Sequence, residues 1–216
     1  MTRLRTLLLA LSIAAATPNV IAVNPSFPAK DYKAFVDLLQ KNPGKHSYGS
    51  GGNGTVGHLL AELYKSVAKV DMIHIPYRGS GPALNDVVAG QLPIIVDNLP
   101  STLPFIKDKR LIPIVVAAPK RLAELPDVPT FAEVGLEPVN RMSFLGVSAP
   151  KGTPKDLVDK VHAAVKAALA DASVKARIEA TGAIVVGNAV EEYQKQVRDE
   201  YSLYKRVVLE QKLKLE

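Results

Sequence analysis

Short apolar runs alternate with amphipathic stretches along most of this chain. Two runs, at residues 92–96 and 112–118, are apolar throughout, which is typical of strands covered on both faces. Between the runs, apolar residues recur at intervals of three and four, as at Val56, Leu60 and Leu63, which indicates helices with one buried face. This alternation predicts an α/β fold with a mainly parallel sheet.

The same pattern, with its glycine, proline and capping signals, places the individual elements. Strands are predicted at residues 19–23, just before 50, and at 72–76, 92–96, 112–118, 143–148 and 183–186. Helices are predicted at 31–41, 56–69, 82–90 and 101–106, with Pro82 as a first helical residue, then from 153 to 169 and from 188 to 208. In the last two helices the residues expected to face inward are Leu157, Val158, Val161, Val165 and Leu169, and then Val190, Tyr193, Val197, Tyr201, Tyr204 and Val208.

Two capping boxes are expected. Thr130 is followed three residues later by Glu133, and Asn188 is followed by Glu191, so each pair can satisfy two free amides at a helix start.

A glycine-rich loop at residues 50–55 separates a short strand from the 56–69 helix. Asn53 or Thr55 is expected to cap that helix. The glycines allow a ligand to approach the backbone closely, and the free amides and positive end of the helix favour an anion. A strand-to-helix turn that merely needs glycine fits the local sequence equally well.

Two further loops follow predicted strands, at residues 77–82 and at Asp97–Asn98. Ligands of open α/β sheets bind beyond the carboxyl ends of the strands, so three loops at one edge favour the anion site over a plain turn. The candidate ligand-binding residues are therefore Ser50, Gly51, Gly52, Asn53, Gly54, Thr55, His58, Tyr77, Gly79, Ser80, Asp97 and Asn98.

Composition narrows the classes of function. The net charge of +6 suits an anionic ligand, but the basic residues are spread out with few aromatics between them, so nucleic acid is not expected as a partner. Cysteine is absent, which excludes disulfides and thiolate chemistry.

The sequence carries no catalytic constellation. A nucleophile elbow, a phosphate-binding P-loop and a metalloprotease helix motif are all missing. His58 and Glu62 have a spacing that can hold a metal, but no second histidine joins them. The glycines at 49, 51 and 54 match the dinucleotide fingerprint only weakly, because no acidic residue follows at the required distance. We therefore expect a binding protein that is not an enzyme and uses no metal or cofactor.

The first residues have the features of an export signal. Arg3 and Arg5 precede a ten-residue apolar run, Leu7 to Ala16, which is too short to span a bilayer. Cleavage is expected before Thr17 or after Ala22. The alternative is an internal start, in which case the protein would be cytoplasmic rather than periplasmic.

Several blocks together resemble one receptor family. These blocks are Ser-Gly-Gly-Asn-Gly-Thr with His-Leu-x-x-Glu at 50–62, Ile-Pro-Tyr-Arg-Gly-Ser-Gly-Pro-Ala at 75–83, Asp-Asn-Leu-Pro-Ser at 97–101, Leu-Pro-Asp-Val-Pro-Thr at 125–130 and Ala-Pro-Lys-Gly-Thr-Pro at 149–154. They are similar to the Bug-type extracytoplasmic solute receptors of tripartite tricarboxylate transporters, and the likeness covers the chain from about residue 18 to its end.

The resemblance implies a periplasmic-binding-protein-like Venus flytrap fold of type II, with two α/β lobes. It implies capture of a small organic anion, such as a di- or tricarboxylate, an amino-acid-like ligand or an aromatic acid, and its delivery to a membrane permease. In the family, main-chain amides of the loop matching residues 50–55, the helix end and bridging waters hold a ligand carboxylate.

The chain departs from the family pattern at its start, where a strand, a proline- and glycine-rich loop and further elements of the first lobe are missing. The expected organisation is a signal-like segment at 1–16, a complete three-layer lobe at 17–142 and the closing part of a truncated lobe at 143–216. Two alternatives to a receptor stay open: a truncated remnant that binds nothing, and a protein-interaction or sensing module of the same fold.

Overall fold

The computed structural model describes residues 8–214, which divide into two compact units. One unit contains the residues up to 17 together with 144–206, and the other contains 18–143 together with the residues from 207 onward. This division differs from the expected one, because the N-terminal segment groups with 144–206 instead of standing apart. In the part of the chain that the structure describes, no helix has the length and apolar character needed to cross a membrane.

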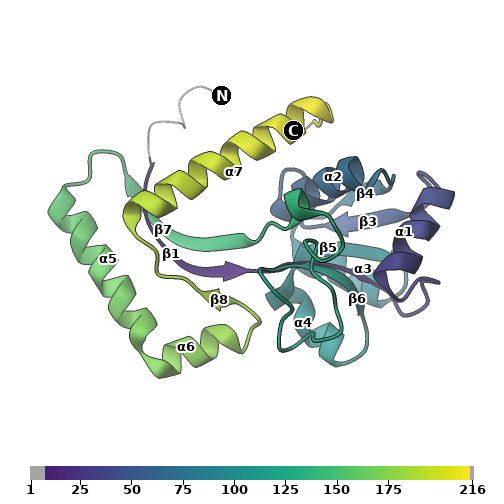
Figure 1. Cartoon of the computed structure of the whole chain (residues 1–216), viewed down its shortest axis with the longest axis horizontal. Helices are drawn as coiled ribbons and strands as arrows, with labels where there is room; N and C mark the ends of the chain where they lie inside the picture. The colour runs from purple at the N-terminus through teal and green to yellow at the C-terminus, as the bar shows by residue number, and fades with distance from the viewer. Residues whose placement is uncertain (1–7, 215–216) are drawn as a thin grey trace. The chain divides into compact units, whose positions relative to one another are not determined.

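The larger unit is built on a five-stranded sheet, shown in Figure 1. Its strands, in spatial order, are β4 (Ile73–Pro76), β3 (Ser47–Ser50), β5 (Ile94–Asn98), β2 (Asn19–Val23) and β6 (Ile112–Ala117). β3 runs parallel to β4 and β5, whereas β2 runs antiparallel to both β5 and β6. The first residue of β2 therefore pairs with the last residues of its neighbours, and Asn19 lies opposite Asn98 and Ala117.

Helices cover both faces of this sheet. They are α1 (Tyr32–Lys41), α2 (Val56–Ala68), α3 (Ser80–Val88), α4 (Leu99–Lys107) and the short 3₁₀ helix η2 (Glu137–Val139). α2 and α4 lie on opposite sides of the sheet in Figure 1. α3 and α4 each begin two residues before their predicted starts, because Gly79 and Asn98 take the cap positions.

The core follows from the direction of alternate side chains on β2. All five of its residues are buried, as a central strand with two covered faces requires. Val20 and Ala22 point into one apolar cluster with residues of α3 and α4. Near the opposite face, α1 and α2 contribute an aromatic group in which the Phe35 and Tyr64 rings lie 6.4 Å apart. The sheet edge that carries the three candidate loops is thus supported from both sides.

The predicted capping boxes have different outcomes. The first is confirmed, because the Thr130 N–H donates to Glu133 at 2.8 Å and the Glu133 N–H donates to the Thr130 hydroxyl at 3.2 Å. In the second, the Ala189 N–H donates to Glu192 at 3.1 Å, so both the donor and the glutamate lie one residue later than expected.

The smaller unit has a three-stranded sheet in the order β7 (Ser143–Pro150), β1 (Leu8–Thr17) and β8 (Ile184–Val185). Its helices are α5 (Lys155–Ala170), α6 (Ala172–Glu179), which the sequence pattern did not predict, and most of α7 (Val190–Glu210). Gly146 on β7 lies directly under the ring of Tyr193, where an added Cβ would be only 2.6 Å from that ring.

The apolar run at residues 8–16, interpreted from the sequence as part of an export signal, forms strand β1 in the structure, and the interpretation as a signal stays a prediction. These residues form the central strand of the smaller sheet, antiparallel to β8, with Ala15 opposite Val185 and Ala16 opposite Ile184. A ten-residue apolar run is compatible with an export signal and with a buried strand, so the sequence pattern does not distinguish the two. Residues 1–7, with the two arginines, lie outside the described residues.

The expected inward faces of the last two long helices are wrong in part. On α5 only Val158 is buried, while Leu157 and Val161 are 47% and 39% exposed. On α7 Tyr193 is buried, but Tyr201 is 50% exposed. The spacing predicted a covered stripe on each helix, and the described chain covers only part of it.

Candidate functional site

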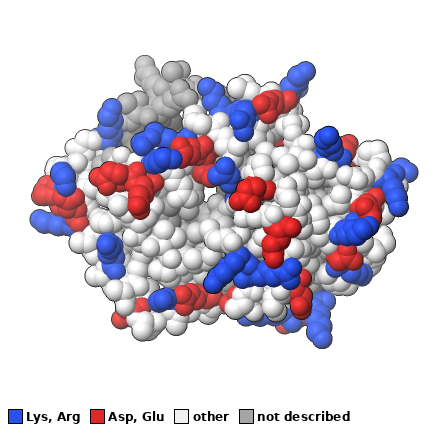
Figure 2. Space-filling model, in the orientation of Figure 1, with Lys and Arg blue, Asp and Glu red and all other residues white. Residues whose placement is uncertain are grey.

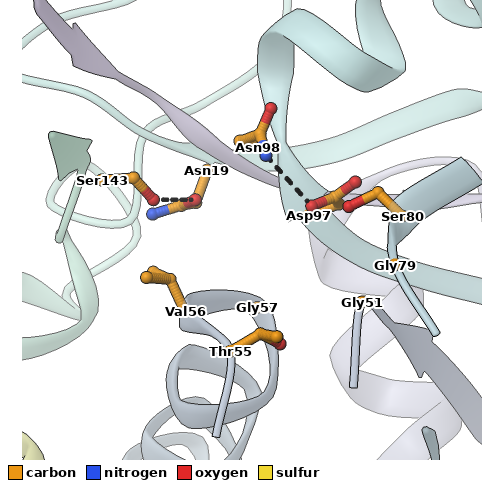
Figure 3. A pocket seen from close by; sticks show the side chains of 10 residues that line it. All are labelled: Asn19, Gly51, Thr55, Val56, Gly57, Gly79, Ser80, Asp97, Asn98 and Ser143. Carbon is orange, nitrogen blue, oxygen red and sulfur yellow. Dashed lines mark hydrogen bonds between the residues drawn. The ribbon is translucent and has the colours of Figure 1, made fainter. Parts of the chain in front are cut away.

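A cavity of about 260 Å³ lies within the larger unit, at the edge where β3, β4 and β5 end. Figure 3 shows the ten residues that line it, which are Asn19, Gly51, Thr55, Val56, Gly57, Gly79, Ser80, Asp97, Asn98 and Ser143. All three candidate loops therefore contribute to one cavity.

The start of α2 supplies backbone donors to this cavity. Thr55 is the N-cap and its hydroxyl accepts from the His58 N–H, the third amide of the helix. Val56 and Gly57 hold the first two positions, whose amides have no acceptor within a helix. Both residues line the cavity, and amides at the start of a helix are the groups that commonly bind anions.

Gly57 lets the start of α2 lie directly on β5. A Cβ at this position would press into the Val96 carbonyl group, only 3.2 Å from the carbonyl carbon, and would lie 3.7 Å from the Asp97 Cα. A side chain of any size would therefore force the first turn of α2 away from the sheet edge.

The start of α3 forms another wall. Gly79 caps this helix with a φ of 104°, a conformation that favours glycine, and Ser80 is the first helical residue. The Gly79 N–H donates to the Gly51 carbonyl at 3.0 Å, which joins the loop before α3 to the glycine loop before α2.

The opposite side of the cavity is neutral and polar. Ser143 donates its hydroxyl to the Asn19 side-chain carbonyl at 2.9 Å, and the Asn19 amide donates to the Arg141 carbonyl at 2.8 Å. Asn98 caps α4, accepting from the Ser101 N–H at 3.3 Å. These bonds hold the side chains in fixed orientations.

Asp97 is the only acidic residue among those that line the cavity, and it is 6% exposed. Its Oδ1 accepts from the Asn98 side-chain amide at 3.2 Å, while its buried Oδ2 has no well-directed partner in the described chain. Burial raises the pKa of Asp97, and hydrogen bonds from Ser80 and the Asn98 backbone oppose that rise. Figure 3 shows the carboxyl group between Asn98 and Ser80.

Two stacked histidines support the glycine loop from below. The His58 and His74 rings lie 4.0 Å apart at an angle of 10°. The Gly54 N–H donates to His58 Nδ1 at 3.0 Å, and the Ser50 hydroxyl lies 2.7 Å from His74 Nε2. Burial lowers the pKa of both histidines, that of His74 to about 4, so both rings are neutral near pH 7. His58 is buried and positions the loop without lining the cavity.

Six of the twelve candidate residues line the cavity, namely Gly51, Thr55, Gly79, Ser80, Asp97 and Asn98. The other six, Ser50, Gly52, Asn53, Gly54, His58 and Tyr77, do not. Tyr77 instead donates its hydroxyl to Asp86 at 2.6 Å, and the Ser50 hydroxyl accepts from the Gly52 N–H. These groups stabilise the loops that carry the lining residues.

Sequence reasoning missed four lining residues: Asn19, Val56, Gly57 and Ser143. Val56 and Gly57 follow from the cap, because a cap at Thr55 makes them the first two helical positions. Asn19 required the direction of β2. Ser143 is 124 residues from its partner Asn19, and no local signal joins them.

The arrangement suits binding of an anion by dipoles. None of the ten lining residues is Lys, Arg or His, so the cavity has no formal positive charge. Among the described residues, no cluster of three or more His, Asp or Glu could hold a metal ion. In Figure 2 the basic and acidic side chains are interspersed over the visible face without a continuous basic patch.

The family model described as the tripartite tricarboxylate transporter family receptor matches residues 3–213. The chain belongs to this family. This match confirms the expected resemblance, and the family is described as a transporter receptor family.

Curated relatives extend beyond the matched region. The chain is 34% identical over 202 residues to the UPF0065 protein in the tcbD–tcbE intergenic region of Pseudomonas sp. (strain P51), which covers 93% of this chain and 60% of that protein. It is 28% identical to BugT of Bordetella pertussis, over 96% of this chain and 64% of BugT. The chain thus spans less than two thirds of the length of these two relatives.

Solved structures confirm the periplasmic-binding-protein-like α/β fold. A protein described as a periplasmic transporter is 43% identical with a TM-score of 0.90, covering 98% of this chain and 70% of its own. An R. palustris protein solved with adipate is 30% identical with a TM-score of 0.86, over 94% and 68%. MatC of Rhodopseudomonas palustris, solved with malate, is 29% identical with a TM-score of 0.83, over 93% and 69%.

Proposed function

We propose that this chain is an extracytoplasmic solute-binding protein that captures a small carboxylate in the cavity at the edge of the five-stranded sheet. The observation that carries this proposal is that Val56 and Gly57, the first two residues of α2, line a cavity together with the start of α3. The first amides of a helix have no acceptor within it. A ligand carboxylate would accept from these N–H groups and would be stabilised by the positive helix ends.

The size of the effect is adequate for a receptor. A hydrogen bond to a charged group contributes about 1.5–3 kcal/mol, and a partly buried anion at a helix start gains up to about 2 kcal/mol. Two amides and two helix ends therefore supply a large part of the roughly 8 kcal/mol that micromolar affinity requires. Two relatives were solved with adipate and malate, which supports a dicarboxylate as the ligand class.

Substitution by proline tests this mode directly, because proline removes one N–H. The first helical position tolerates proline, and Thr55 already has the extended backbone (φ −68°, ψ 160°) that a residue before proline needs. We expect Val56→Pro to weaken malate and adipate binding about 10- to 150-fold, in keeping with the loss of one charge-assisted bond, with little change in unfolding midpoint. Isothermal titration calorimetry and urea denaturation measure the two quantities.

Ala172→Pro is the matched control. Ala172 holds the first position of α6, after an extended Asp171, and it does not line the cavity. Val56→Ala controls for the lost side chain. Unchanged affinity in Val56→Pro, or a folded wild-type chain that binds neither acid, would contradict the proposal.

We propose further that the larger unit is one complete lobe of the receptor and that the smaller unit is the closing part of a second lobe. The coverage of about 60–70% of each relative supports this organisation. Export to the periplasm and delivery of the ligand to a transporter permease belong to the same proposal, and they rest on family membership.

A second candidate, self-association, has one observation in its favour. The smaller unit exposes large apolar side chains, including Leu145 at 60% and Leu157 at 47%. Apolar surface of this kind promotes association when it is contiguous. Light scattering that shows a monomer at every concentration would exclude this role, whereas a dimer that Leu145→Ser dissociates would support it.

A further inference from the structure

We propose that Asp97 binds the ligand by sharing one proton with the ligand carboxylate, so that capture of the acid is coupled to uptake of a proton. The inference rests on the proposed carboxylate site. It assigns Asp97 the role of a hydrogen-bond donor within that site.

The geometry isolates one carboxyl oxygen for this role. Oδ1 accepts from the Asn98 side chain, and the Ser80 side chain and the Asn98 backbone also bond the carboxyl group. Oδ2 is buried without a well-directed partner in the described residues, on a side chain that lines the cavity and is 6% exposed. A buried polar atom without a partner is unfavourable, so Oδ2 is the atom that a ligand would pair.

An ionised Asp97 would oppose an anionic ligand. Two unit charges 4 Å apart repel by about 4 kcal/mol at an effective dielectric constant of 20, and no Lys, Arg or His lines the cavity to offset this repulsion. One proton between the two carboxyl groups removes the repulsion and creates a strong hydrogen bond, as in other sites where two carboxylates meet. The proton comes from solvent and is held between Oδ2 and a ligand oxygen, so no covalent step is involved.

The surroundings of Asp97 contain few competing charges. On β2 it lies opposite Val20, and α2 approaches it through Gly57. Of the ionisable groups further along α2, His58 is bonded to the Gly54 N–H, and Glu62 is bonded to the Tyr48 hydroxyl and paired with Lys65. On the α3 side the neighbour of Asp97 is Ser80. Arg78, just before α3, is exposed, and Asp86 on α3 accepts from Tyr77.

On the α4 side, Asn98 and Leu99 are uncharged, and Lys107 lies at the far end of the helix. The pKa of the Asp97 carboxyl group is thus set by its burial and by its hydrogen bonds with Ser80 and Asn98.

The sign of the pH dependence follows from the shared proton. Pairing with a ligand carboxylate raises the pKa of the pair above that of free Asp97. Binding is therefore strongest at pH values below the pKa of free Asp97 and weakens as pH rises toward the pKa of the pair. One proton taken up gives at most about a 10-fold loss of affinity per pH unit, so up to roughly 100-fold between pH 6 and pH 8. A free aliphatic acid is already ionised in this range and does not contribute.

The test is calorimetry of the whole chain with malate and with adipate at pH 6 and pH 8, in buffers of different ionisation enthalpy. We expect net proton uptake and weaker binding at pH 8. Asp97→Asn should bind at pH 8 nearly as well as the wild type at pH 6, without proton uptake. The reason is that the Asn98 donors orient the new amide with its carbonyl at the Oδ1 position and its NH₂ group toward the cavity.

Asp97→Leu keeps the branched shape and the number of heavy atoms but has no donor, and we expect it to bind weakly at both pH values. Urea denaturation of each variant verifies folding. Binding by the wild type that is independent of pH, with Asp97→Asn weaker at both values, would overturn the shared proton and leave the proposed function standing. A folded wild-type chain that binds neither acid at either pH would overturn both.

Discussion

The contact of Gly57 with β5 makes the position of the α2 start testable by adding one methyl group. In Gly57→Ala the new Cβ would press into the Val96 carbonyl, 3.2 Å from its carbon, where the backbone of a central strand cannot yield easily. An ordinary carbon-to-oxygen contact is about 3.3–3.6 Å, and the new Cβ would overlap the Val96 carbonyl oxygen far inside this distance. The first turn of α2 must therefore move outward by roughly 1 Å.

This movement has consequences for stability and for binding. Overpacking of this kind destabilises a fold by about 1–3 kcal/mol, and the better helix propensity of alanine returns at most about 1 kcal/mol. A hydrogen bond of 2.9 Å lengthened by about 1 Å is no longer a hydrogen bond. Loss of one bond to a carboxylate corresponds to about 1.5–3 kcal/mol, or roughly a 10- to 150-fold rise in Kd.

Gly81→Ala is a close control, because Gly81 is the second residue of α3 as Gly57 is of α2. A Cβ on Gly81 meets nothing within 4 Å, and Gly81 does not line the cavity. Calorimetry with malate and adipate, together with urea denaturation, should show the loss for Gly57→Ala alone. Wild-type affinity in both variants, or the same loss of affinity in both, would refute the reasoning.

Three further outcomes are expected. Thr55→Ala should lower the free energy of unfolding by about 1 kcal/mol and weaken ligand binding. Asp31→Ala removes the cap of α1 and should lower the free energy of unfolding by a similar amount with binding unchanged. Equal binding by both variants would contradict this. The pKa of His74 is lowered to about 4, so the stability that the neutral ring contributes is present above its unfolded pKa near 6.5 and is lost as pH falls from there toward 4. Urea denaturation should therefore show a flatter dependence of stability on pH for His74→Gln. An unchanged dependence would argue against a buried neutral ring. His58→Ala should weaken binding at both pH 6 and pH 8, since the ring accepts from the Gly54 N–H and burial lowers its pKa, and calorimetry at both values checks this.

Much of the larger unit could be predicted from local pattern, because its signals are local. The continuous apolar run before Asp97 requires two covered faces, and the first box at Thr130 requires only neighbours three residues apart. The candidate loops could be found because strand ends and glycines mark them. Thr55 was one of two possible caps, and the structure selects it through its bond to the His58 N–H.

What could not be predicted depends on partners distant in sequence. The direction of β2, which brings Asn19 to the cavity, is set by pairing with β5 and β6 and leaves no trace in five apolar positions. Residues 8–16 have the composition of a leader, and their pairing as β1 depends on β8, which lies more than 160 residues later in the sequence. The unpaired Oδ2 of Asp97 depends on the packing of α2 and Ser80 around it.

The donors proposed at the start of α2 belong to the main chain, and this has a consequence for how such a receptor can diversify. An ordinary point substitution changes a side chain but cannot delete an N–H group, and only proline does so. The hydrogen-bond donors to the ligand carboxylate are therefore kept in most mutants, while side chains around the rest of the cavity are free to vary. New ligands could thus be acquired by altering what surrounds the remainder of the molecule, with the anchor for its carboxylate inherited unchanged.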